Sequence, residues 1–160
     1  MTIQLVDADT PTRIEHIRVL FEEYARSLGF SLCFQEFDRE LTGLPGDYAP
    51  PAGRLIVAYG DNKPAGCVAL RPIKGSICEM KRLYVRPEFR HTGLGRQLAA
   101  GIIADARERG YTHMRLDTIN TMTAALTLYR ALGFVEIEPY YPDPLPGVVY
   151  LELDLGRESA

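Results

Sequence analysis

The sequence contains no tryptophan and little cysteine. Its three cysteines, Cys33, Cys67 and Cys78, form no CxxC pair and are not flanked by histidine at a metal-binding spacing. Because their number is small and odd, a framework of disulfides is not expected, and neither is a metal site. The composition favours a protein of a reducing compartment, and we expect it in the cytoplasm.

Long apolar runs are also absent. No stretch approaches the roughly 20 apolar residues that a membrane-spanning helix requires, and the first residues lack the basic, apolar and cleavable pattern of a signal peptide. The formal net charge is −3 and the sequence pI is near 5.6, which argues against a general nucleic-acid-binding protein. We therefore expect a soluble protein with neither a membrane nor a nucleic acid as partner.

Length and composition fit one domain that spans residues 1–160. The chain is 46% apolar and 24% charged, which suits a globular core. Apolar patterns predict a helix capped by Thr10 and ended by Gly29, and short turns between residues 54 and 85 predict an antiparallel meander. The strand at 113–117 is predicted to lie parallel to 76–85. The predicted strands are 2–6, 54–59, 65–72, 76–85, 113–117, 134–138 and 148–155, and the further helices are 93–109, 121–132 and a short patch at 34–41.

The most informative segment, residues 79–98, runs from a strand through a glycine turn into a helix. Gly93 and Gly95 carry no Cβ, so backbone N–H groups can approach a ligand closely. The helix that begins there has four N–H groups without intrahelical partners, and phosphate is their natural ligand. The sequence therefore predicts a site for a ligand with several phosphates. Four arginines surround the turn in sequence: Arg82, Arg86, Arg90 and Arg96.

Three interpretations of the glycine turn compete. A Walker-type phosphate loop is excluded, because no Gly-Lys-Ser or Gly-Lys-Thr follows. A nicotinamide dinucleotide site is favoured by Asp117, which ends an apolar run about 20 residues on, where a ribose-binding acid is expected. Against it, Leu98 occupies the third glycine position and Pro87 separates the strand from the turn. A helix that is merely capped by small residues is the third interpretation.

Two short motifs follow one another along the chain. Residues 90–95 read Arg-His-Thr-Gly-Leu-Gly, and residues 125–134 read Ala-x-x-Leu-Tyr-x-x-Leu-Gly-Phe. Together with Leu-Tyr-Val-Arg-Pro at 83–87, they resemble the signatures of the GCN5-related N-acetyltransferase (GNAT) superfamily, over about residues 54–155. The resemblance implies an α/β (α+β) fold with a mixed, mostly antiparallel central sheet of about seven strands, flanked by helices, with a splayed parallel strand pair.

The resemblance also implies acetyl-CoA as the acyl donor. Its pyrophosphate would be held by the N–H groups of residues 91–96, and its pantetheine arm would lie along the backbone of residues 83–85. A bulge in this strand would free an N–H group near Val85 to polarise the thioester carbonyl. The cofactor-binding residues predicted in this way are Leu83, Tyr84, Val85, Arg90, His91, Thr92, Gly93, Leu94, Gly95 and Arg96.

Transfer to an amine requires two proton transfers. An alkyl ammonium, with a pKa near the value of about 10.4 for lysine, must lose a proton before it can attack. Our candidate acceptor is Glu79, since strand alternation places it on the same face as Lys81, Leu83 and Val85. The alternative is that Glu79 only pairs with a neighbouring cation. His91 and His113 are weaker candidates.

The leaving thiolate needs a proton donor, and the resemblance implies Tyr129 for this role. A tyrosine that merely packs in the core is the alternative. Met122 stands where many members of the family carry asparagine, which removes one side-chain contact to the donor arm. Cys67 and Cys78 fall in strand patterns and favour buried apolar positions, so we expect direct acetyl transfer to a primary amine within one ternary complex.

The acceptor is the least defined part of the prediction. A small-molecule amine or a peptide or protein amine would be bound by regions of about 21–50 and 139–147, which are rich in aromatic residues. The alternative function is a non-catalytic acyl-CoA-binding regulatory module. Residues 148–155 could form an exposed strand that pairs two subunits into a homodimer. The aromatic and acidic candidates in the two regions are Phe30, Phe34, Glu36, Phe37, Asp38, Asp47, Tyr140, Tyr141, Pro142 and Pro144.

Overall fold

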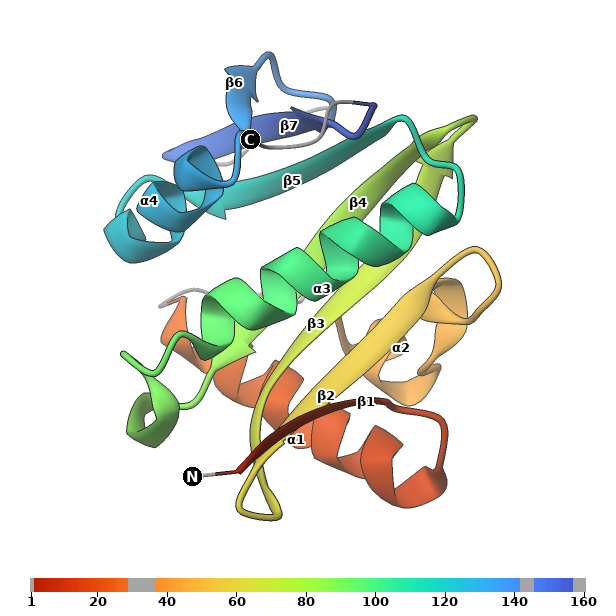
Figure 1. Ribbon diagram of the computed structural model, residues 1–160, viewed down its shortest axis with the longest axis vertical. Helices are drawn as coiled ribbons and strands as arrows, with labels where there is room; N and C mark the ends of the chain where they lie inside the picture. Colours follow the sequence, from red (N-terminus) through yellow and green to blue (C-terminus); the bar gives the residue numbers. More distant parts are fainter. Residues whose placement is uncertain (1, 29–36, 142–145, 157–160) are drawn as a thin grey trace.

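The computed structural model describes residues 2–28, 37–141 and 146–156. Within them, seven strands form one sheet in the order β1-β2-β3-β4-β5-β7-β6 (Figure 1). Neighbouring strands are antiparallel except β4 and β5, which are parallel. The predicted mixed, mostly antiparallel sheet is therefore confirmed. The strands are β1 (Ile3–Asp7), β2 (Arg54–Gly60), β3 (Lys63–Lys74), β4 (Ile77–Val85), β5 (His113–Ile119), β6 (Val135–Ile137) and β7 (Val148–Asp154).

The helices of the described residues begin and end close to the predicted positions. Thr10 caps α1, because its hydroxyl accepts a hydrogen bond from the backbone N–H of Arg13 at 3.2 Å. The predicted helical patch at 34–41 lies partly outside the described residues, and its described part belongs to α2. The helices are α1 (Pro11–Ser27), α2 (Phe37–Thr42), α3 (Leu94–Glu108) and α4 (Thr123–Ala131), with 3-10 turns η2 (Gly46–Tyr48) and η3 (Pro87–Phe89).

Two apolar clusters cover the two faces of the sheet. Helices α3 and α4 pack on one face, here called the α3 face, through residues such as Leu98 and Leu126. Helices α1 and α2 pack on the other, the α1 face, through residues such as Phe21 and Phe37. Figure 1 shows α3 in front of β3 and β4, with α1 behind the sheet. A site placed between β4 and β5 therefore has helices on both sides.

One side of α4 packs on the α3 face. Ala125, Leu128 and Leu132 are partly buried and pack against the apolar cluster of that face. Leu126 and Tyr129 are the buried residues of this helix. The helix is therefore rotated so that Tyr129 enters the core, and Ala125 and Leu128 lie along its border.

Residues 148–154 form a strand, as predicted, but this strand is not an edge of the sheet. Strand β7 pairs with β5 on one side and with β6 on the other, so its backbone groups are used within the sheet. The outer strands of the described sheet are β1 and β6. Strand β7 therefore has no free backbone edge for pairing with a second subunit, and a homodimer stays a prediction.

Candidate active site

A bulge in β4 decides which way its side chains point. Cys67 of β3 lies opposite Tyr84, but Ala69 lies opposite Lys81, so two residues of β4 face one residue of β3. Arg82, inside this bulge, adopts a left-handed backbone with φ +61°. The bulge therefore reverses the alternation of side chains along the strand.

The reversal overturns one prediction about Glu79. Leu83 and Val85 pack with the cluster on the α3 face, whereas Tyr84 packs with the cluster on the α1 face. Glu79 and Lys81 lie opposite Arg71 and Ala69, and Ala69 belongs to the α1 face. Glu79 therefore shares a face with Lys81 but not with Leu83 and Val85.

The parallel pair of strands separates just beyond Glu79. The register between β4 and β5 covers three residue pairs and ends with Glu79 opposite Arg115. Both strands continue, β4 to Val85 and β5 to Ile119, without pairing to each other along the described register. The predicted splay is thus present, and it opens a gap in the sheet from one face to the other.

An outer groove runs from the glycine turn to this gap. Its volume is about 460 Å³, and it lies between the end of β4, the start of α4 and the end of α1. Three predicted cofactor-binding residues of β4 and two of the glycine turn line it. The outer groove is lined by Tyr24, Ser27, Leu83, Tyr84, Val85, Arg90, Gly95, Thr121, Met122, Thr123, Ala124, Ala125 and Leu128.

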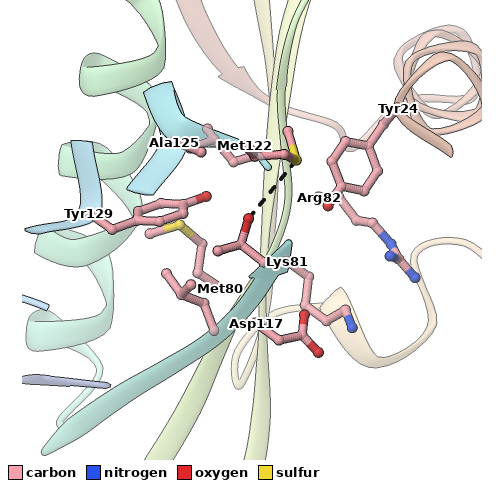
Figure 2. A pocket seen from close by; sticks show the side chains of 11 residues that line it. Tyr24, Met80, Lys81, Arg82, Asp117, Met122, Ala125 and Tyr129 are labelled. Carbon is pink, nitrogen blue, oxygen red and sulfur yellow. Dashed lines mark hydrogen bonds between the residues drawn. The ribbon is translucent and has the colours of Figure 1, made fainter. Parts of the chain in front are cut away.

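An inner pocket of about 50 Å³ occupies the gap itself (Figure 2). It shares Tyr24, Leu83, Met122 and Ala125 with the outer groove, so the two spaces adjoin. Side chains from both faces of the sheet meet in it, and many of them are polar. The inner pocket is lined by Tyr24, Met80, Lys81, Arg82, Leu83, Leu116, Asp117, Thr118, Met122, Ala125 and Tyr129.

Tyr129 points its hydroxyl into the inner pocket from α4 (Figure 2). Its ring is 7% exposed and packs edge-on against Phe134, with ring centroids 5.7 Å apart. Burial raises the pKa of Tyr129 above its usual range, so the phenol stays protonated at neutral pH. Tyr129 therefore presents a protonated hydroxyl, a hydrogen-bond donor, to the inner pocket.

The glycine turn has the backbone that an anion site requires. His91 and Gly93 both adopt left-handed conformations, with φ +64° and +84°, and α3 begins directly after them. The turn is held by Thr92, whose hydroxyl donates to the Phe89 carbonyl, and by Arg90, whose Nε donates to the Val85 carbonyl. His91, Thr92, Gly93 and Arg96 are exposed. The first N–H groups of α3 are thus presented to solvent at one end of the outer groove.

Gly95 lines the outer groove, and the surrounding side chains leave room for a larger residue at this position. A Cβ added there would meet only Val85 and Leu128, at the ordinary distances of 3.8 and 3.9 Å. Such a methyl group would instead occupy space in the outer groove, which Gly95 lines. The protein itself would therefore accommodate a methyl group at this position, and the groove would lose the space that the methyl group fills.

Two of the four arginines do not serve the turn. Arg82 forms two hydrogen bonds to Glu40, at 3.0 and 2.8 Å, and Arg86 forms two to Glu23, at 3.0 and 2.7 Å. The first pair ties β4 to α2, and the second ties the residue that follows β4 to α1, both on the α1 face. The prediction that Arg82 and Arg86 add positive charge at the turn is therefore wrong, and Arg90 and Arg96 remain there.

Glu79 lies at the centre of a buried hydrogen-bond cluster. Its side chain is 0% exposed. One carboxylate oxygen accepts from Arg71 Nε at 2.7 Å, and the other accepts from the hydroxyls of Tyr140 and Tyr141, both at 2.7 Å. Burial alone would raise the pKa of Glu79, but the charges of Lys81 and Arg71 and the two hydroxyls together hold it below its usual range. A carboxylate in this setting keeps its negative charge and binds a proton poorly.

Sequence reasoning missed the partners of Glu79. Arg71 had a detectable signal, because it lies directly opposite Glu79 in an antiparallel meander of predicted strands. Tyr140 and Tyr141 had none, since they come from the connection between β6 and β7, more than 60 residues away. This connection was predicted to bound the acceptor site, and its two tyrosines are fixed beside the gap.

Lys81 and Asp117 extend to the same side of the inner pocket (Figure 2). The side chain of Lys81 is 10% exposed, and its Nζ lies 4.0 Å from Glu79 Oε1. Burial lowers the pKa of Lys81, and the negative charges of Glu79 and Asp117 offset only part of this effect. Asp117, weighed from the sequence as a ribose-binding acid, therefore lies in the inner pocket and not beside the glycine turn.

The remaining predicted residues are placed as follows. Cys67 and Cys78 are fully buried, and burial raises the pKa of both thiols, that of Cys78 to about 12. They are poor nucleophiles. His113 begins β5, and its Nδ1 lies 3.0 Å from the hydroxyl of Thr112. Phe37 packs under the Arg82 guanidinium, 5.2 Å from it. Cys33, Phe30, Phe34, Glu36, Pro142 and Pro144 lie outside the described residues.

The described residues contain no group of three or more histidine, cysteine or acidic side chains that could hold a metal ion. None of their helices is long and apolar enough to span a bilayer.

Comparison with known proteins places this geometry in a family. Residues 15–134 match the acetyltransferase (GNAT) family. An uncharacterised N-acetyltransferase of Schizosaccharomyces pombe is 42% identical over 149 residues, which cover 92% of this chain and 91% of the relative. A GNAT-family acetyltransferase of Staphylococcus aureus has the same fold, with a TM-score of 0.80 at 17% identity over 96% of this chain and 99% of that one.

A second solved structure carries a ligand. The PaiA N-acetyltransferase of Thermoplasma acidophilum, in complex with coenzyme A, matches with a TM-score of 0.72 at 17% identity over 96% of this chain and 99% of its own. Since the family match spans most of the chain and the fold agrees, the chain belongs to the GNAT family of acetyltransferases and is an acyl-CoA-dependent enzyme.

Proposed function

We propose that the protein transfers an acetyl group from acetyl-CoA directly to a primary amine. The observation that carries the proposal is the continuity of the outer groove with the inner pocket, where Tyr129 supplies a protonated hydroxyl. A donor bound in the groove with its phosphates at the α3 N-terminus would direct its thioester into the gap. The PaiA enzyme, which shares the fold, binds coenzyme A.

We assign donor binding to the residues predicted from the sequence. The N–H groups of Leu94, Gly95 and Arg96 precede the first hydrogen bond within α3, which Gln97 donates to the Gly93 carbonyl. They suit pyrophosphate oxygens, with Arg90 and Arg96 as nearby cations. Residues 91–93 shape the turn. The gap-facing backbone of residues 83–85 suits the amide groups of the pantetheine arm. The bulge lies at Arg82 and Leu83, earlier in β4 than the predicted position near Val85, and we propose that an N–H group beside the bulge polarises the thioester carbonyl.

The reaction has two parts, attack by the acceptor amine and departure of the CoA thiolate. The neutral nitrogen of the acceptor attacks the thioester carbon, so that a C–N bond forms and the C–S bond breaks, and the nitrogen then releases one proton to water to become the amide. The Tyr129 hydroxyl gives its proton to the leaving thiolate, whose pKa resembles that of a cysteine thiol, about 8.5. The donor supplies the activated acetyl group. No covalent acetyl-enzyme is needed.

The contacts of Glu79 change the role that we assign to it. Both of its oxygens already accept hydrogen bonds, and its pKa is lowered, so it is poorly suited to take a proton from the acceptor. We propose instead that Glu79 positions Lys81, Tyr140 and Tyr141 around the acceptor side of the gap. The ammonium proton of the acceptor would then leave to water in the inner pocket before attack.

The first experiment compares the melting temperature with acetyl-CoA, CoA and NAD at matched concentrations. A ligand at 100 times its Kd adds about 2.7 kcal/mol of stability, so specific binding gives a clear shift. We expect a shift with acetyl-CoA and CoA but not with NAD. Release of the CoA thiol is then measured with a panel of amines.

The outcomes of this experiment separate the alternatives. Amine-dependent thiol release supports the transferase. Tight binding of acetyl-CoA without thiol release for any amine would support the non-catalytic acyl-CoA-binding module. A shift with NAD alone would contradict the donor site.

A further inference from the structure

The buried charges around the gap leave one cation and one anion facing the inner pocket. Arg82 is paired with Glu40 through two hydrogen bonds, and Arg71 is paired with Glu79. Each of these pairs is internally neutral. Lys81 and Asp117 also line the inner pocket, and they carry opposite charges.

The ammonium of Lys81 has hydrogen-bonding capacity to offer to a ligand. Its distance of 4.0 Å from Glu79 is that of a charge pair, beyond the range of a hydrogen bond. The nearer donors on Glu79 are Arg71 and the two tyrosine hydroxyls, which surround both carboxylate oxygens. An ammonium carries three donors, so an anion in the pocket could bind Lys81 without breaking this cluster.

Asp117 supplies the complementary charge. It is half-buried near the end of β5, the strand that borders the gap opposite β4. Its negative charge acts to raise the pKa of Lys81 and of the tyrosines Tyr24 and Tyr129. All three residues also line the inner pocket. An ammonium group placed beside Asp117 would therefore lie within the same small space as Tyr129.

We propose that the acceptor is a free α-amino acid, an inference that rests on the proposed acetyl transfer. Its ammonium would bind Asp117 and its carboxylate would bind Lys81. Lys81 has Glu79 as a charge partner at 4.0 Å but donates no hydrogen bond to it, and Asp117 faces the pocket from across the gap. A zwitterion offers a carboxylate to Lys81 and an ammonium to Asp117, whereas a simple amine offers nothing to Lys81. A diamine would place a second cation near Lys81 and Arg82, and a peptide N-terminus lacks the carboxylate.

The transfer balances with this acceptor. The ammonium loses one proton to water, and its neutral nitrogen then forms the C–N bond to the acetyl carbon as the C–S bond breaks. The nitrogen releases a second proton to water to become the amide, the thiolate receives the Tyr129 proton, and the phenolate is reprotonated from solvent, so that one proton is released overall. The products are an N-acetyl amino acid and CoA.

The test measures CoA-thiol release with the common L-amino acids and with the amide of each amino acid that is turned over, such as L-methionine against L-methioninamide. The amide keeps the amine and the side chain and removes only the carboxylate charge. We expect kcat/KM to be about ten- to a hundred-fold higher for the acid, since a hydrogen bond to a charged group is removed. Most of the difference should lie in KM.

Variants assign this preference to Lys81. Lys81→Met should lower the ratio of kcat/KM for acid over amide about ten-fold or more, and Lys81→Arg should retain most of the ratio. Lys74→Met, which changes an exposed lysine at the end of β3, is the matched control and should leave the ratio unchanged. The melting-temperature shift with acetyl-CoA reports whether each variant is folded and binds the donor.

Three results would overturn the inference. One is an equal kcat/KM for an amide and its acid. A second is an equal loss of kcat/KM for both acceptors in Lys81→Met. The third is a protein that binds acetyl-CoA and acetylates amines of other classes but none of the common amino acids. If acetyl-CoA neither binds nor is consumed, the proposed function itself fails, and the inference fails with it.

Discussion

Arg71 and Glu79 lie opposite each other on β3 and β4, and Arg71 Nε donates to Glu79 Oε1 at 2.7 Å. The pair is a fixed point between the sheet and the connection from β6 to β7, because Tyr140 and Tyr141 donate to the other oxygen of the same carboxylate. Arg71, Tyr140 and Tyr141 thus all donate hydrogen bonds to the carboxylate of Glu79.

The first prediction concerns the stability of this cluster. Glu79→Ala leaves the Arg71 guanidinium and two hydroxyls without their common acceptor, and loss of one partner of a buried ion pair typically costs about 3–5 kcal/mol. We expect a loss of about that size in the free energy of unfolding, measured by urea denaturation. Glu136→Ala, at an exposed position of β6, is the control and should change stability little. A cost below about 1 kcal/mol for Glu79→Ala would mean that the cluster does not hold the fold together.

The second prediction is the pH dependence of stability. The pKa of Glu79 in the folded protein lies below its ordinary value of 4.5, so the unfolded chain binds the proton more tightly. The stabilisation is present above pH 4.5 and is lost as the pH falls through the lowered pKa of the folded state. Unfolding measured between neutral pH and acid should show a smaller loss for Glu79→Gln than for the wild type. Parallel curves would contradict the lowered pKa.

The third prediction separates the chemistry of Tyr129 from donor binding. Tyr129→Phe removes the proton donor but keeps the ring that packs on Phe134. We expect kcat to fall about 10²–10⁴-fold, with little change in the melting shift caused by acetyl-CoA. The wild type should also show no loss of activity from phenol ionisation up to pH 10.0, the ordinary pKa of tyrosine, because burial raises the value for Tyr129. Tyr111→Phe is the control, because Tyr111 lines neither the outer groove nor the inner pocket and its hydroxyl donates to the Ala52 carbonyl at 2.7 Å. Equal losses in binding and turnover would argue against the acid role.

The fourth prediction contrasts two glycines that differ in backbone. Gly93→Ala places a Cβ on a residue with φ +84° and should cost about 1–2 kcal/mol of stability, although no atom lies within 4 Å of the new methyl. Gly95→Ala lies in a helix with room for a methyl, so stability should stay equal or rise by up to about 1 kcal/mol. The same change should weaken acetyl-CoA binding about ten-fold, as measured by titration. Unchanged binding in Gly95→Ala would place the donor elsewhere.

Local signals account for what the sequence could predict. The glycine turn, the cap at Thr10 and the two motifs are encoded within a few residues, and the helices and strands follow them closely. The parallel pairing of β4 and β5 also followed, because a strand, helix and strand in one sheet leave little choice of topology. These features define the donor side of the site.

The acceptor side depended on features that no short pattern encodes. Strand alternation failed at Arg82, because a left-handed residue within a bulge reverses every side chain after it. The meeting of Lys81 and Asp117 depends on the splay of two strands whose residues are more than 30 positions apart in sequence. The hydrogen bonds from Tyr140 and Tyr141 to Glu79 depend on the connection between β6 and β7, which lies more than 60 residues from Glu79 in sequence.

The parting of β4 from β5 also gives the sheet an internal edge. Beyond Glu79, the described backbone of β4 pairs with β3 on one side and faces the gap on the other. Amides on such an edge exchange their hydrogens with solvent faster than amides held on both sides. A donor arm that pairs with this edge would act as a missing strand, and hydrogen exchange should slow over residues 83–85 when it binds. The enzyme would then be most ordered while the donor is bound.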